Sequence, residues 1–123
     1  MLYKDLSDVI LDAIFAVHKG LGSGLLELPY QNALFNKLSK SGLYVTKEAS
    51  YPVYFEGDIV GEYFADLVVE NKIIIEVKAV KQLTEVMEAQ VINYLKISRL
   101  QLGYLVNFRN GSAEWKRLVN FSP

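Results

Sequence analysis

Two short apolar runs near the middle of the chain, residues 64–69 and 73–77, are rich in β-branched side chains. Such runs are typical of buried strands, and the polar segment 70–72 between them is typical of a turn. The pattern therefore predicts a β-hairpin. Both strands of this hairpin carry charged residues, which is unusual because burying an unpaired charge is costly.

Three charged residues of the hairpin are candidates for chemistry: Asp66 in the first strand, Glu76 in the second, and Lys78 close behind it. Side chains alternate along a strand, so Glu76 and Lys78 share one face. A three-residue turn at 70–72 pairs Asp66 with Glu76 on that face. A two-residue turn at 71–72 would place them on opposite faces unless a bulge intervened. We expect Asp66 to lie beside Glu76.

Two carboxylates on one face provide the oxygen ligands that a hard divalent cation such as Mg²⁺ prefers. A lysine two residues further on can hold or polarise a water near that cation. Asp66, Glu76 and Lys78 are therefore a candidate site for phosphodiester hydrolysis. The alternative interpretation is a structural ion pair on a half-exposed face of the sheet. The three positions alone leave both interpretations open.

The periodicity of apolar residues predicts the other elements. Helices are expected over residues 5–18, 27–40 and 83–97, and strands over residues 44–47, 51–55, 59–69, 73–78, 101–108 and 115–119. Pro52 predicts an edge strand or a bulge. We expect one α/β domain over residues 1–123, in which helices flank a mixed sheet. The strands with Asp66 and Glu76 should be central antiparallel neighbours.

Three polar residues on the predicted helices have two interpretations each. Glu27 stands at a helix start, where the backbone dipole favours a carboxylate whatever its function. Gln90 and Tyr94 are four residues apart, so they lie on the same side of their helix. Hydrogen bonding in the core and a functional role would both account for them.

The composition bears on partners and location. Hydrophobic residues make up 51% of the chain and eight residues are tyrosines, so we expect an apolar surface shared with a second copy in a homodimer. No apolar run is long enough to span a membrane and no signal peptide is visible. Cysteine is absent, which excludes thiolate metal sites and favours a cytoplasmic location. The net charge of −1 leaves any nucleic-acid contact to a local patch.

Several motifs together resemble a known family. Residues 24–30, Gly-Leu-Leu-Glu-Leu-Pro-Tyr, match the G-x-x-E-x-x-Y signature of the small proteins named after it. The resemblance continues through residues 65–69, 75–80 and 88–95 and covers almost the whole chain. That family is similar to the PD-(D/E)XK nuclease superfamily, whose restriction-endonuclease-like core is a helix, a mixed central sheet and a second flanking helix. Ala65 stands where the superfamily pattern has proline.

The resemblance implies a metal site. Asp66 and Glu76 correspond to its main ligands, Glu27 to the helix carboxylate that completes it, and the backbone carbonyl of Val77 to a further ligand. Lys78 corresponds to the catalytic lysine.

Gln90 and Tyr94 match the Gln-x-x-x-Tyr element of RecB-like members of the superfamily, which implies that they orient the site or contact substrate phosphate.

The function that the resemblance implies is Mg²⁺- or Mn²⁺-dependent hydrolysis of phosphodiester bonds in DNA or RNA. Fold resemblance does not determine the substrate. The alternatives are a catalytically silent nuclease-fold module for binding or assembly, and an enzyme that acts on a small phosphorylated molecule.

Overall fold

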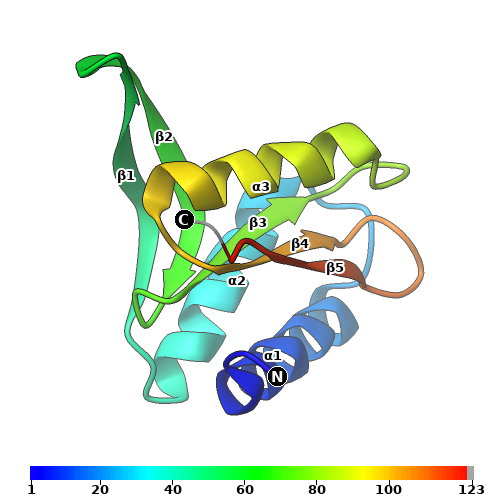
Figure 1. Ribbon diagram of the computed structural model, residues 1–123. Coiled ribbons are helices and arrows are strands. Elements are labelled where there is room, and N and C mark those ends of the chain that lie inside the picture. The colour runs from blue at the N-terminus through cyan, green and yellow to red at the C-terminus, as the bar shows by residue number, and fades with distance from the viewer. Residues whose placement is uncertain (122–123) are drawn as a thin grey trace.

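A five-stranded mixed sheet forms the centre of the protein, as seen in a computed structural model that describes residues 1–121 (Figure 1). The strand order is β1-β2-β3-β4-β5; β3 and β4 are parallel, and all other neighbours are antiparallel. The elements are α1 (Lys4–Leu21), α2 (Glu27–Lys40), β1 (Val45–Phe55), β2 (Asp58–Val69), β3 (Ile73–Lys78), α3 (Glu85–Ser98), β4 (Leu102–Asn107) and β5 (Glu114–Val119). The expected fold is confirmed, including the antiparallel pairing of β2 with β3 inside the sheet.

The helices cover both faces of this sheet. Apolar side chains of α1 and α2 pack on the face to which Ile75 and Val77 point. On the opposite face, Leu95 of α3 packs in a cluster with Ile74. Because side chains alternate along β3, Glu76 belongs to the same face as Ile74, the face that α3 covers.

The turn between β2 and β3 has the predicted three residues. Val69 pairs with Ile73 across it. Glu70 and Asn71 within the turn adopt the left-handed backbone conformation, with φ of 54° and 53°. The register continues from this turn along both strands toward Asp66 and Glu76.

The first strand differs from the prediction. Residues 44–47 and 51–55 were expected to be separate strands, but β1 runs without interruption through both. Glu48 lies at the expected break, with a left-handed φ of 53°, and the pairing of β1 with β2 skips Glu48 and Asp66. Pro52 lies in an edge strand, as predicted, and the register shifts just beyond it, between Val53 and Tyr54.

The alternation of side chains changes sides at the skipped pair. Val45 and Leu67 pack with α1 and α2, whereas Ala49 and Tyr63 pack with the cluster beneath α3. These residues are separated by even numbers along their strands, so regular strands would place them on one face. The irregularity therefore turns the outer part of the hairpin toward α3.

The outer part of the β1–β2 hairpin, residues 49–65, forms an arm that extends beyond the rest of the sheet (Figure 1). Its tip carries Tyr54, Phe55, Ile59 and Val60, each of which is 61–63% exposed. Part of the apolar content noted in the sequence therefore lies on the surface of this arm, outside the core.

Tyr30 anchors the start of α2. Its hydroxyl donates a hydrogen bond to the carbonyl of Gly22 at 2.6 Å and accepts one from the N–H of Leu25 at 3.3 Å. Its ring stacks on Phe108, which directly follows β4, with a centroid distance of 4.5 Å. The loop that leads into Glu27 is thereby fixed against the end of the sheet.

The contact of α3 with β4 depends on a glycine. A Cβ at Gly103 would lie 3.0 Å from Cγ1 of Val91 and 3.5 Å from Cδ2 of Leu95. Val91 is β-branched and therefore has little rotamer freedom in a helix. The absence of a side chain at Gly103 lets α3 approach the sheet closely.

We expect Gly103→Ala to destabilise the fold by about 1–3 kcal/mol, because the added methyl group overpacks the contact with Val91. Chemical denaturation measures this change. Gly61→Ala is the matched control, since that glycine also lies in a strand and a Cβ there would meet nothing within 4 Å. Equal stability of Gly103→Ala and wild type would contradict the close contact.

Candidate active site

Asp66 and Glu76 come together where the β2–β3 ladder ends. The last backbone pair of this ladder joins Leu67 to Ile75. One step further, Oδ2 of Asp66 accepts a hydrogen bond from the N–H of Val77 at 2.8 Å. The Asp66 side chain thus replaces a backbone partner of β3 and lies next to Glu76, which is only 6% exposed.

This pair of carboxyl groups is electrostatically unusual. Burial, followed by the negative charge of Asp66, raises the pKa of Glu76 to about 8. Burial also raises the pKa of Asp66, and the hydrogen bond from Val77 opposes that rise. Because Glu76 is buried and Asp66 is partly buried, two carboxyl groups this close ionise together only at a cost, so a proton or a cation at the pair is favoured.

Tyr63 is a site residue that the sequence pattern did not reveal. Its hydroxyl donates a hydrogen bond to Oε1 of Glu76. It lies three residues before Asp66 on β2, so regular alternation predicts that it faces the other side of the sheet. The irregularity at Glu48 and Asp66 brings it to the α3 face, and apolar periodicity carries no signal of that irregularity.

Tyr94 of α3 reaches the same site. Its ring stacks on the ring of Tyr63 with a centroid distance of 3.9 Å and an interplanar angle of 10°. Burial raises the pKa of Tyr94, with smaller contributions from the charges of Glu76 and Asp66. Gln90, one helical turn earlier, is exposed. The structure thus brings Tyr94 to the carboxyl pair, whereas Gln90 lies at the surface.

Lys78 ends β3 on the face of Glu76. Its side chain is partly buried, and its positive charge lowers the pKa of Asp66, against the larger effect of burial. The carbonyl of Lys78 accepts a hydrogen bond from the N–H of Phe108 at 3.0 Å.

Asn107 fixes the loop that follows β3, because its side chain both donates to the carbonyl of Val80 and accepts from the N–H of Val80.

A structural ion pair was the alternative interpretation of these charges. Within residues 1–121, the salt bridge that forms joins Lys4 to Asp8 at 2.8 Å on the surface. Asp66 and Lys78 therefore make no salt bridge with each other in this structure. Lys78 is close enough to lower the pKa of Asp66. Its ammonium group is available to another partner.

Gln31 supports the site from α2. This side chain is 5% exposed, and its Nε2 donates to the carbonyl of Asp66 at 3.1 Å and to Oε1 of Glu48 at 2.8 Å. Gln31 therefore connects β1 and β2 to α2 at Glu48 and Asp66, where the pairing of these two strands is interrupted. The sequence pattern singled out neither Gln31 nor Glu48.

Residues 4–118 match the sequence model of the PD-(D/E)XK nuclease superfamily. The chain belongs to this superfamily. The wider family expected from the motifs is thus confirmed, and membership of the narrower G-x-x-E-x-x-Y family stays a prediction.

Two solved structures share the fold. The crystal structure of SSO0001 aligns with a TM-score of 0.61 at 20% identity, over 76% of this chain and 50% of that one, so this chain spans half the length of SSO0001. The alkaline exonuclease LHK-Exo from Laribacter hongkongensis aligns with a TM-score of 0.56 at 12% identity, over 98% of this chain and 72% of that one. Likeness at such identities shows the fold alone. No curated protein matches this sequence at a significant level.

Glu27 is the first residue of α2 and is partly buried. Within residues 1–121, no three Asp, Glu or His side chains lie close enough together to hold a metal ion. The structure therefore gathers the carboxyl groups of Asp66 and Glu76 and does not bring that of Glu27 into the same cluster. A role for Glu27 as a metal ligand in this PD-(D/E)XK protein stays a prediction.

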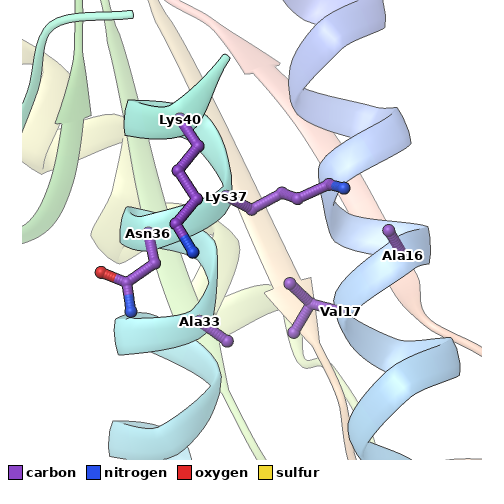
Figure 2. A pocket seen from close by; sticks show the side chains of 6 residues that line it. All are labelled: Ala16, Val17, Ala33, Asn36, Lys37 and Lys40. Atoms are coloured by element: carbon purple, nitrogen blue, oxygen red, sulfur yellow. The ribbon is translucent and has the colours of Figure 1, made fainter. Parts of the chain in front are cut away.

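A pocket of about 420 Å³ lies between α1 and α2 (Figure 2). It is lined by Ala16, Val17, Ala33, Asn36, Lys37 and Lys40. Both lysines belong to the last turn of α2, where positive charge compensates the negative end of the helix dipole. This dipole role accounts for their placement, and the pocket contains none of the predicted site residues.

The raised pKa of Glu76 predicts how the stability of the metal-free protein depends on pH. In the folded protein the pKa of Glu76 is about 8, whereas the ordinary pKa of a glutamate side chain is 4.5. Between these values the folded state binds more protons than the unfolded state. The contribution of Glu76 to stability therefore falls as the pH rises through this window.

Urea unfolding in the presence of a chelator, at several pH values across this window, tests the expectation. Glu76→Gln keeps a neutral side chain at every pH and should show a shallower decline than wild type. Parallel declines in the two proteins would show that Glu76 does not titrate in this range.

Proposed function

We propose that this protein is a metal-dependent nuclease that hydrolyses phosphodiester bonds in nucleic acid. The observation that carries the proposal is the pair of the buried Glu76 and the partly buried Asp66 beside Lys78, at the end of the β2–β3 ladder of a PD-(D/E)XK fold. The pair is desolvated and carries negative charge that the fold only partly compensates. A cation would remove that cost, and this is a common arrangement at functional sites.

The donor set fits Mg²⁺ or Mn²⁺. Mg²⁺ prefers oxygen ligands and keeps several waters, so one or two carboxylates are sufficient protein ligands. Asp66 and Glu76 would hold the ion together with the carbonyl of Val77, and Glu27 is the proposed fourth ligand. A bound ion would lower the pKa of a water and stabilise negative charge on the phosphate.

The other proposed site residues act on water and phosphate. Lys78, on the same face as Glu76, would position the attacking water or stabilise developing negative charge through its ammonium group. Tyr94 would contact a substrate phosphate next to the carboxyl pair. Gln90 would do the same from the surface of α3, where it is free to meet a bound strand.

The proposed partners are nucleic acid and a second copy of the chain. The expected homodimer is supported by the exposed apolar residues at the tip of the arm, which are the kind of surface that a partner buries. We propose that residues 1–123 act as one domain in the cytoplasm. No helix in the part of the chain that the structure describes is long and apolar enough to cross a membrane.

A catalytically silent binding or assembly module is the alternative. One observation favours it: the carboxyl groups of Glu27, Asp66 and Glu76 do not form one cluster in the described residues. Such a module would retain the fold and bind nucleic acid or a protein without cleaving it. The experiment below separates the two functions.

The first test is a metal titration by calorimetry together with a cleavage assay on single- and double-stranded DNA and RNA. We expect Mg²⁺ or Mn²⁺ to bind, to raise the melting temperature and to support cleavage. Ca²⁺ should bind with little turnover, because its looser coordination holds the attacking water less well. Glu76→Ala should abolish metal binding and cleavage together.

Glu62→Ala is the matched control for Glu76→Ala, because Glu62 is an exposed carboxylate on the neighbouring strand, β2. It should bind metal and cleave as wild type does. Metal binding without cleavage of any of these substrates would support the silent module. No metal binding, with an unchanged melting temperature in Mg²⁺ and Mn²⁺, would contradict the nuclease proposal.

Lys78→Ala tests the role of the lysine separately. Since Lys78 is not proposed as a ligand, metal affinity should stay close to that of wild type. Turnover should fall by about two to four powers of ten, which is the range for positioned catalytic groups. Single-turnover kinetics at saturating metal measures the effect, and wild-type turnover in this variant would remove Lys78 from the mechanism.

A further inference from the structure

Glu76 depends on a residue that neither the motifs nor the family match assigns. We propose that Tyr63 is a positioning residue: it fixes the orientation of the Glu76 carboxylate for metal binding by donating its hydroxyl proton to Oε1. This inference rests on the proposed metal-dependent function and adds a determinant of metal affinity to it. A carboxylate held through one oxygen presents the other oxygen in one direction.

Tyr63 is itself held firmly. Its side chain is 8% exposed. Its ring stacks on Tyr94 at a centroid distance of 3.9 Å and on Tyr51 at 6.1 Å. The ring therefore has little freedom to move, and the hydroxyl at its end gives Glu76 a fixed partner.

The backbone irregularity that brings Tyr63 to this face is costly. Glu48 has a left-handed φ of 53° inside β1, a strained conformation that non-glycine residues rarely adopt. Without the irregularity, alternation would place Tyr63 on the face opposite Glu76. Such a strained conformation persists where surrounding contacts hold the backbone in place. Here Gln31 donates hydrogen bonds to both Glu48 and Asp66.

A purely structural role accounts poorly for this arrangement. An apolar residue in place of Glu76 would pack beneath Tyr63 without the cost of a buried carboxyl group. A buried tyrosine needs one partner for its hydroxyl, and here that partner is the most buried of the proposed carboxylate ligands. Hydrogen-bond partners of metal-ligating carboxylates set the orientation of those ligands, and removing one typically lowers metal affinity or activity about 10–100-fold.

Tyr63→Phe tests the proposal, because phenylalanine keeps the ring and its stacking and removes only the hydroxyl. Tyr51→Phe is the matched control: it removes a hydroxyl from the neighbouring ring of the same stack, and that hydroxyl does not bond Glu76. Calorimetry measures Mn²⁺ affinity, thermal melts measure stability without metal, and kinetics on a cleaved oligonucleotide separate kcat from KM.

We expect Tyr63→Phe to bind Mn²⁺ about 10–100-fold more weakly than wild type. Its metal-free melting temperature should stay close to that of Tyr51→Phe. At Mn²⁺ concentrations below saturation kcat should fall, and KM for the oligonucleotide should be unchanged. Tyr51→Phe should match wild type in metal affinity.

A second measurement uses the wild-type protein and does not depend on the folding of a variant. Titration with diamagnetic Mg²⁺, followed by NMR of ¹³C-labelled tyrosine rings, should shift the Tyr63 signals with the affinity measured by calorimetry. The signals of Tyr44, which is exposed, should not shift. In Glu76→Ala the Tyr63 response should disappear.

The outcomes distinguish this inference from the function on which it rests. Wild-type Mn²⁺ affinity in Tyr63→Phe, an equal loss of affinity in Tyr51→Phe, or Tyr63 signals that do not respond to Mg²⁺ would each overturn the positioning role and leave the nuclease proposal intact. Wild-type protein that binds neither Mg²⁺ nor Mn²⁺ would overturn both.

Discussion

The close approach of two carboxyl groups, the buried Glu76 and the partly buried Asp66, is the constraint on which the rest of the structure depends. Asp66 and Glu76 repel each other when both are ionised, and burial strengthens that repulsion. The fold surrounds the pair with hydrogen-bond donors and positive charge from three directions: the N–H of Val77, the hydroxyl of Tyr63 and the ammonium group of Lys78. Each of these partners compensates part of the charge, and none of them makes a full ion pair.

The same pair explains why the sheet is irregular around Asp66. The β2–β3 ladder stops at Leu67, the residue next to Asp66, and the β1–β2 ladder skips Asp66. A regular ladder through Asp66 would bind its backbone on both sides and leave Tyr63 facing away from Glu76. The interruption frees the Asp66 side chain to bond β3, and it lets the arm turn toward α3. Local loss of regular pairing and assembly of the candidate site therefore have one structural cause.

The sequence predicted what depends on local patterns. The three-residue turn and the alternation along β3 were sufficient to place Asp66 beside Glu76, and apolar periodicity located α2 at Glu27–Lys40. What it did not predict depends on backbone conformation and tertiary packing. The strand β1 continues through the left-handed Glu48 where two strands were predicted, and the irregularity at Glu48 and Asp66 brings Tyr63 to the site. The position of Glu27 relative to Asp66 depends on how α2 packs, which no sequence spacing encodes.

The close approach of α3 to β4 has a consequence for the space between α3 and the Asp66–Glu76 pair. Val91, which contacts the backbone at Gly103, lies one helical turn before Tyr94. Lifting the helix at this contact would also lift Tyr94 from the ring of Tyr63, and Tyr63 holds Glu76. Gly103 on the neighbouring strand β4, which has no side chain, therefore sets the distance between α3 and the carboxyl pair. A change of one methyl group there would alter the depth of the site without touching any residue that forms it.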